Sequence, residues 1–100
     1  MNEKLHLNDN DFSQIQYYSG RVQRAKGNYQ NALKKFRESL MFANKSGDII
    51  NIAKACYQIG ILNLFVGNMG VSIELLLKAK NKLVVHLNIA IPNASVSPDA

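Results

Sequence analysis

An internal repeat of 40 residues constrains the fold of this chain more than any other feature. Four residues recur unchanged after a shift of 40 positions, which pairs Tyr17 with Tyr57, Gly20 with Gly60, and Gly27-Asn28 with Gly67-Asn68. Apolar positions also match, as in Val22 with Leu62, Leu33 with Ile73 and Phe36 with Leu76. Periods of this length are typical of folds in which one supersecondary unit stacks on the next. The sequence therefore predicts two copies of one unit in tandem.

The first copy begins with a predicted helix whose apolar residues recur every three or four positions. Asp11 is expected to cap this helix, with Gln14 in the capping-box position. Five apolar residues are expected to face the core: Phe12, Ile15, Tyr18, Val22 and Ala25. Gly27-Asn28 ends the helix, because both residues tolerate the left-handed backbone that a tight reversal requires.

Three more helices are predicted after this turn. The second starts near Tyr29 and has a continuous apolar stripe: Tyr29, Ala32, Leu33, Phe36, Leu40 and Ala43. Ser46-Gly47-Asp48 ends it, and Asp48 is expected to cap the third helix, Ile49–Val66. That helix is apolar almost all round, which is typical of a central element flanked on both sides. The fourth helix is expected over residues 69–86.

These patterns predict an all-α protein of two tandem helix-turn-helix repeats, whose four antiparallel helices form a fragment of an α-solenoid. The expected divisions are a polar N-terminal segment (1–10), a first repeat (11–48), a second repeat (49–88) and a flexible C-terminal tail (89–100). One hundred residues with 47% apolar side chains suffice for one modest core. A four-helix bundle without repeat geometry is the alternative fold.

The pattern resembles the tetratricopeptide repeat family. Its units place a small residue in the first helix, a Gly-Asp/Asn-aromatic turn after it, and a small residue followed by an aromatic in the second helix. The first copy has Gly20, Gly27-Asn28-Tyr29, Ala32 and Phe36, and the second has Gly60, Gly67-Asn68-Met69, Ser72, Leu76 and Ala79. The long period is similar to the extended repeats of bacterial peptide-sensing regulators and cell-polarity adaptors. Polar residues depart from the family pattern at Gln16, Ser19, Gln23 and Asn63.

The resemblance implies a scaffold that binds a protein or peptide on the concave face formed by the first helix of each repeat. The matching positions are Gln14, Tyr17, Arg21, Arg24, Lys54, Tyr57, Ile61 and Leu64. Tyrosines one repeat apart could flank a peptide whose carboxylates pair with the cations, so an acidic and partly apolar ligand is expected. In the alternative interpretation, the tyrosines are packing residues and the arginines only solvate the first helix.

The fourth predicted helix has two apolar faces. One is expected to pack on the third helix through Ser72, Leu75, Leu76, Ala79 and Leu83. The other consists of Ile73, Leu77 and Val84, and terminal units of repeat arrays normally carry a polar cap instead. We therefore expect an interface here, formed with a second copy in a homodimer, with further repeats of a longer chain, or with a partner helix.

The net charge of +5 favours acidic partners and raises the alternative of a basic nucleic-acid-binding repeat. Helical spacing argues against that alternative, because Arg21 and Arg24 belong to one helix whereas Lys34, Lys35 and Arg37 spread around the next. A four-helix dimerisation module of a larger regulator is a further alternative.

Catalytic and metal-binding patterns are missing from the sequence. It contains no Gly-rich phosphate loop, Ser-His-Asp set or convergent carboxylate pair, and neither His6 nor His86 has a neighbouring His or Cys. We therefore expect a non-enzymatic protein without a cofactor or metal. Cys56 is expected to be a buried thiol. No signal peptide or membrane-spanning run is apparent, so a cytoplasmic location is expected.

Overall fold

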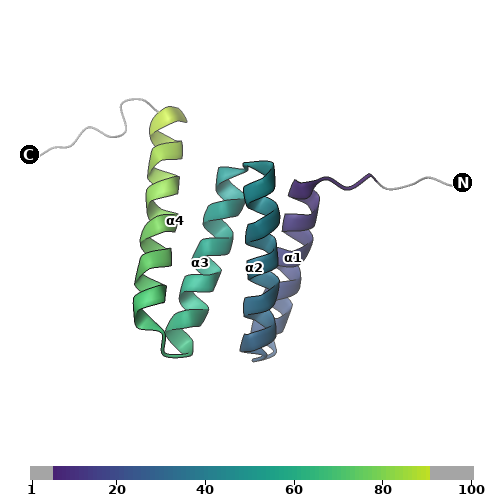
Figure 1. The fold of residues 1–100 in the computed structure, drawn as a ribbon, viewed down its shortest axis with the longest axis vertical. Helices are drawn as coiled ribbons and strands as arrows, with labels where there is room; N and C mark the ends of the chain where they lie inside the picture. The colour runs from purple at the N-terminus through teal and green to yellow at the C-terminus, as the bar shows by residue number, and fades with distance from the viewer. Residues whose placement is uncertain (1–5, 91–100) are drawn as a thin grey trace, which may run out of the picture.

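Four α-helices make up the part of the chain described by the structure, a computed structural model that covers residues 6–90, with side chains as far as Leu87. The helices are α1 (Asp9–Ala25), α2 (Tyr29–Ser46), α3 (Ile49–Phe65) and α4 (Met69–Ala90), and they alternate in direction (Figure 1). α1 packs with α2 and α3 with α4, while α3 joins the pairs mainly through α2. The predicted all-α fold of two tandem helix pairs is confirmed.

The ends of the helices differ from the prediction at two places. Asn8, rather than Asp11, caps α1: the Asn8 side chain accepts from the Asp11 backbone N–H at 2.8 Å, and Asp11 accepts from the Asn8 N–H at 3.0 Å. The expected cap was wrong because this reciprocal pair satisfies two N–H groups at the start of the helix, which then includes part of segment 1–10. α4 continues past residue 86 to Ala90, and the rest of the predicted tail lies outside the described residues.

Asp48 has its predicted role at the start of α3. Its side chain accepts from the Asn51 backbone N–H at 2.9 Å. The preceding Gly47 has a φ of 74°, and its N–H bonds to the Ala43 carbonyl at 2.9 Å. Only glycine adopts this backbone without strain, so the chain reverses between the two repeats at the predicted place.

The two Gly-Asn turns are alike in their hydrogen bonds. In the first, the Asn28 N–H bonds to the Gln23 carbonyl at 2.9 Å and the Gly27 N–H to the Arg24 carbonyl at 2.9 Å. In the second, the equivalent bonds are 2.8 Å and 3.2 Å long, and Gly27 and Gly67 have φ angles of 82° and 91°. Both turns therefore form a Schellman motif, which confirms that the 40-residue period is a repeat of structure.

The polar residues at Gln23 and Asn63 belong to these turns. The Asn28 side-chain amide donates to the Gln23 side-chain oxygen at 3.0 Å, and the Asn68 amide donates to the Asn63 side-chain oxygen at 3.3 Å. Each polar residue thus ties the end of one helix to the start of the next. This explains why one repeat position that is apolar in the family pattern is polar in both copies.

A glycine in the first helix of each repeat faces a large side chain of the second. A Cβ added to Gly20 would lie 2.7 Å from the Phe36 ring, and one added to Gly60 would lie 2.9 Å from Leu76 Cγ. Both distances are below van der Waals contact, so only glycine fits without movement. The small residues bring the helices together, as the spacing predicted.

α1 turns the opposite face to the core from the one predicted. Ser13 and Gly20 are buried, whereas all five residues predicted to face the core are exposed: Phe12, Ile15, Tyr18, Val22 and Ala25. The reason is a serine pair: Ser13 donates to the Ser39 carbonyl at 2.9 Å, and Ser39 donates to the Ser13 carbonyl at 2.8 Å. Because these bonds satisfy the buried hydroxyls, a polar stripe packs on α2 and the apolar stripe is left outside.

Within residues 6–90, none of the helices α1 to α4 is both long enough and apolar enough to cross a lipid bilayer.

Candidate functional site

A groove of about 670 Å³ runs between α3 and α4 and reaches Tyr17 of α1. Its walls are mostly apolar and include Ile50, Tyr57, Leu76, Leu83, Val84 and Leu87. Tyr57 and Val84 are both exposed although they lie in an apolar wall. An apolar groove between two helices has the character of the sites in which amphipathic helices dock.

The charged residues that line the groove are Lys54 and Lys80, so its field is positive. The Lys54 ammonium lies 4.5 Å from the centre of the Tyr17 ring and 5.6 Å from that of the Tyr18 ring, which holds it at the α1 side. Carboxylates on the polar face of a bound helix would meet these cations at the groove edges.

A polar network joins α1 to α3 beside the groove. Arg24 donates to the Gln58 side-chain oxygen at 2.6 Å, and the Gln58 amide donates to the Tyr17 hydroxyl at 3.2 Å. The Tyr17 ring also packs edge-on against Phe36, at 5.6 Å between centroids. Tyr17 and Arg24 therefore hold the two repeats together, which agrees with the packing interpretation for Tyr17, whereas Tyr57 is exposed.

The other predicted concave-face residues lie outside the groove, except that Arg24 bonds to Gln58 beside it. Arg21 and Arg24 line a separate hollow of about 340 Å³ with Tyr29 and Phe65, at the turn end of the helices. Gln14 and Leu64 are exposed, and Ile61 is half-buried. The structure thus brings Tyr17, Lys54 and Tyr57 together in the groove and places the two arginines elsewhere.

The predicted apolar face of α4 is exposed at Ile73, Leu77 and Val84. Val84 lines the groove with Tyr57, whereas Leu77 lines a hollow of about 610 Å³ on the other side of α4, together with Val85. The predicted face of α4 is therefore divided: Val84 belongs to the groove between α3 and α4, and Leu77 belongs to the hollow on the other side of the helix.

Cys56 is fully buried between α3 and α4, as expected, where it packs in a cluster with Ala53 and Ala79. Burial raises the pKa of its thiol above the ordinary value, and Lys78 and Lys82 offset part of that increase. The thiol is therefore protonated at neutral pH, which makes it a packing group rather than a nucleophile.

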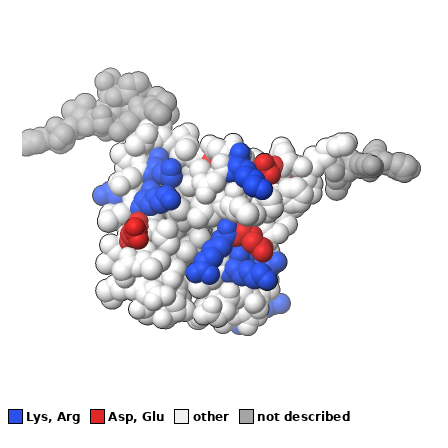
Figure 2. Space-filling view, viewed as in Figure 1, with Lys and Arg blue, Asp and Glu red and all other residues white. Residues whose placement is uncertain are grey.

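Basic side chains do not form one stripe on the face shown in Figure 2. They fall into separate groups with uncharged surface between them, and acidic side chains lie within or beside these groups. Nucleic-acid-binding surfaces carry a patch or stripe of cations along the phosphate backbone. The face shown in Figure 2 has no such stripe.

Several groove residues were not predicted. Gln58 was not predicted to bridge the repeats. The available signal was a polar residue in an otherwise apolar helix, where burial requires a hydrogen-bond partner. Ile50, Lys80 and Leu87 were missed because their role depends on how α3 and α4 cross, which periodicity alone does not give.

Comparisons of the chain with protein-family models, with curated proteins and with solved structures found no match.

Proposed function

We propose that this chain is a protein-interaction scaffold of the tetratricopeptide-repeat kind, which binds a helix of a partner protein in the groove between α3 and α4. The groove itself is the observation that supports this proposal. Its walls expose Ile50, Tyr57 and Val84 to solvent. Exposed apolar surface gathered into a groove is typical of a contact site.

The chemistry of the groove favours an amphipathic partner with an acidic polar face. Apolar residues of the partner would cover Tyr57 and Val84, while its carboxylates would lie near Lys54 and Lys80. Nucleic-acid binding has less support, because the groove walls are apolar and the basic groups seen in Figure 2 are separate.

The proposal can be tested with two synthetic helical peptides that share a Leu-rich face. One carries glutamates on its polar face and the other carries lysines. We expect fluorescence anisotropy to show tighter binding of the acidic peptide, because the groove cations attract its carboxylates. No binding of either peptide would contradict the proposal.

Adjacent residues on α4 supply a matched pair of variants. Val84→Glu puts a charge inside the groove, whereas Val85→Glu puts the same charge on the other side of the helix. We expect Val84→Glu to weaken binding by about tenfold or more, since an unpaired charge in an apolar contact costs over ~1.4 kcal/mol, and Val85→Glu to change it little. Equal losses in both variants would place the site outside the groove.

A further inference from the structure

The first repeat has a surface on which α3 rests. α2 contributes Leu33 and Phe36, which form one buried cluster with Ile59 and Leu62 of α3. α1 contributes residues whose side chains each contact α3 through a hydrogen bond: Asn10, Tyr17 and Arg24. Tyr29 adds a ring contact with Phe65 at 5.6 Å. We call these six residues the receiving surface.

The second repeat has an equivalent of this receiving surface that is uncovered in residues 6–90. A shift of 40 converts the six residues into Ile50, Tyr57, Leu64, Met69, Ile73 and Leu76. All six are apolar or aromatic, Leu76 is half-buried, and the other five are exposed. The hydrogen-bonding Asn10 and Arg24 have become Ile50 and Leu64, so the second receiving surface is suited to a helix face that is more apolar than the one α3 presents to the first repeat.

α1 presents the face that such a helix would need. α3 contacts the first repeat through Ile52, Gln58, Ile59 and Leu62, and Ala55 is buried on the same helix. The same shift taken backwards converts Ile59 into the half-buried Ser19 and the other four residues into Phe12, Ile15, Tyr18 and Val22, which are the exposed stripe of α1. We call these four residues the docking stripe.

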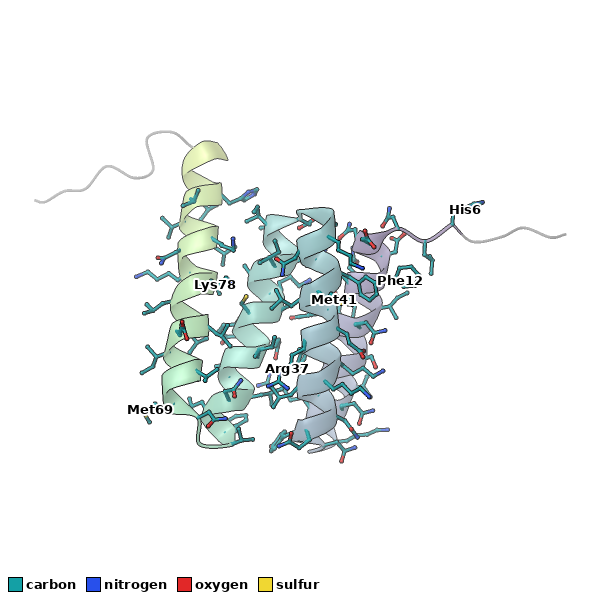
Figure 3. The ribbon with its side chains drawn as sticks, in the orientation of Figure 1. His6, Phe12, Arg37, Met41, Met69 and Lys78 are labelled. Carbon is teal, nitrogen blue, oxygen red and sulfur yellow. The ribbon has the colours of Figure 1, made fainter. Side chains whose placement is uncertain are left out.

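The docking stripe and the uncovered receiving surface lie at opposite ends of the row of helices. Figure 3 shows Phe12 at the α1 edge of the molecule and Met69 at the α4 edge. Within residues 6–90, neither surface has the helix contact that its counterpart makes between α2 and α3, although Phe12 of the docking stripe stacks on Phe42 of its own repeat at 5.3 Å between ring centroids.

We propose that copies of this chain associate head to tail, with α1 of one copy in the groove of the next, in the register that α3 adopts on the first repeat. This inference rests on the proposed function, because it names a second copy as the partner that supplies the helix. The equivalents of these two surfaces, α3 and the receiving surface of the first repeat, already pack in this way within the chain.

Charge supports this occupant. Lys80 takes the place of Leu40, which packs against the cluster that contains Ile52. The incoming helix would bring Phe12 to the position of Ile52, and its first turn carries Asp9 and Asp11. The contact of the half-buried Leu40 is thus replaced by that of a lysine opposite an acidic helix terminus.

The association is of the heterologous type, because the two contacting surfaces are different. Each added copy leaves one docking stripe and one receiving surface uncovered, so growth continues beyond a dimer unless a ring closes. A symmetric dimer through Ile73, Leu77 and Val84 would stop at two copies. This difference makes the two modes distinguishable.

Two charge-introducing variants test the proposal by sedimentation velocity over a wide range of concentrations. Val22→Glu disables the docking stripe and Ile73→Glu disables the receiving surface. Both side chains are half-exposed, so folding should survive, which circular dichroism checks. Met41→Glu, at an exposed position of α2 outside both surfaces, is the matched control (Figure 3).

We expect wild type and Met41→Glu to form species that grow with concentration, and each of the other variants to remain monomeric. A mixture of Val22→Glu with Ile73→Glu should form one-to-one dimers and nothing larger, since only one intact pair of surfaces remains. Three results would overturn the proposal: a monomeric wild type, a wild type that stops at a symmetric dimer, and a mixture that stays monomeric.

The acidic peptide, measured in parallel on Val22→Glu, separates this inference from the proposed function. That variant keeps an intact groove but no docking stripe. Peptide binding that Val84→Glu abolishes, together with a monomeric wild type, would overturn head-to-tail association and leave the scaffold function standing. Loss of both binding and association would overturn both.

Discussion

The two repeats share one backbone plan but differ in how well it is covered. Leu33 in the first repeat is 3% exposed, whereas its equivalent Ile73 is 52% exposed. The residue types are nearly the same, so the difference arises from the neighbour: α3 covers Leu33, and no helix within residues 6–90 covers Ile73. Burial in a repeat protein is thus decided by the adjacent unit as much as by the position's own residue.

The repeats also differ in the side chains that pack between their two helices. The first is built around Phe36, whose ring is wholly buried and contacts Tyr17, while the second has the half-buried Leu76 at the same position. Where the first repeat joins its two helices with hydrogen-bonded Ser13 and Ser39, the second has Ala53 and Ala79. Away from the Asn63–Asn68 bond at its turn, the second repeat therefore joins its helices by apolar contact and should be the weaker half.

The largest expected difference between the repeats is in the free energy of unfolding lost in Phe36→Ala and in Leu76→Ala. Phe36→Ala should lower the free energy of unfolding by about 3–5 kcal/mol, because it removes a buried ring and leaves a cavity. Leu76→Ala should cost about half as much, since its side chain is only partly buried. Urea unfolding of both variants measures this, and equal losses would mean that the second repeat is covered as fully as the first.

A smaller difference is expected between Gly20→Ala and Gly60→Ala. The added methyl at Gly20 meets the fixed ring of Phe36, and overpacking of this kind costs about 1–3 kcal/mol. At Gly60 it meets Leu76, whose half-buried side chain has more room to move than the buried Phe36 ring, and lies 3.3 Å from the Ser72 carbonyl oxygen. The gain of ~1 kcal/mol in helix propensity applies to both variants. Thermal unfolding should therefore rank Gly20→Ala well below Gly60→Ala, and the reverse order would contradict the idea that the first repeat is packed more tightly.

The smallest expected effect is at Ser72, the equivalent of Ala32. The Ser72 hydroxyl is buried and has no hydrogen-bond partner. Ser72→Ala should raise the free energy of unfolding by about 1 kcal/mol, because it removes an unsatisfied polar group. The reciprocal Ala32→Ser change should lower it by a similar amount, and a loss of stability in Ser72→Ala would show that the hydroxyl is satisfied in solution.

Much of the backbone plan could be predicted from the sequence, because it depends on local chemistry. Gly27, Gly47 and Gly67 adopt positive φ angles at the places where the reversals were expected. The 40-residue period also located Gly20 and Gly60 at the close helix contacts. Turn formation and close approach need particular residues, so these residues identify them directly.

The orientation of α1 could not be predicted from apolar spacing. That approach assumes that the apolar stripe faces the core, and in α1 the hydrogen bonds of Ser13 and Ser39 allow the polar face to pack instead. Which hydroxyls meet across an interface depends on the register of two helices, which is a tertiary property. The exposed stripe of Phe12 and Val22 is the consequence.

The candidate site could be predicted only in part, because the crossing of its helices is also a tertiary property. Tyr57 and Val84 were expected at contact surfaces, and both line the groove. Their meeting in one groove depends on how α4 crosses α3, and so does the contribution of Lys80. The pairing of Arg24 with Gln58 depends on the contact between repeats.

The burial of Cys56 has a consequence for kinetics. Because this thiol is buried in a cluster with Ala43 of α2 and Ala79 of α4, a water-soluble alkylating reagent can reach it when α4 moves away from α3 or when the whole protein unfolds. An edge helix with one bare side should detach at a lower free energy than the whole protein unfolds. The alkylation rate of Cys56, the only cysteine of the chain, thus measures how often α4 opens. A protein that binds in the groove should lower this rate.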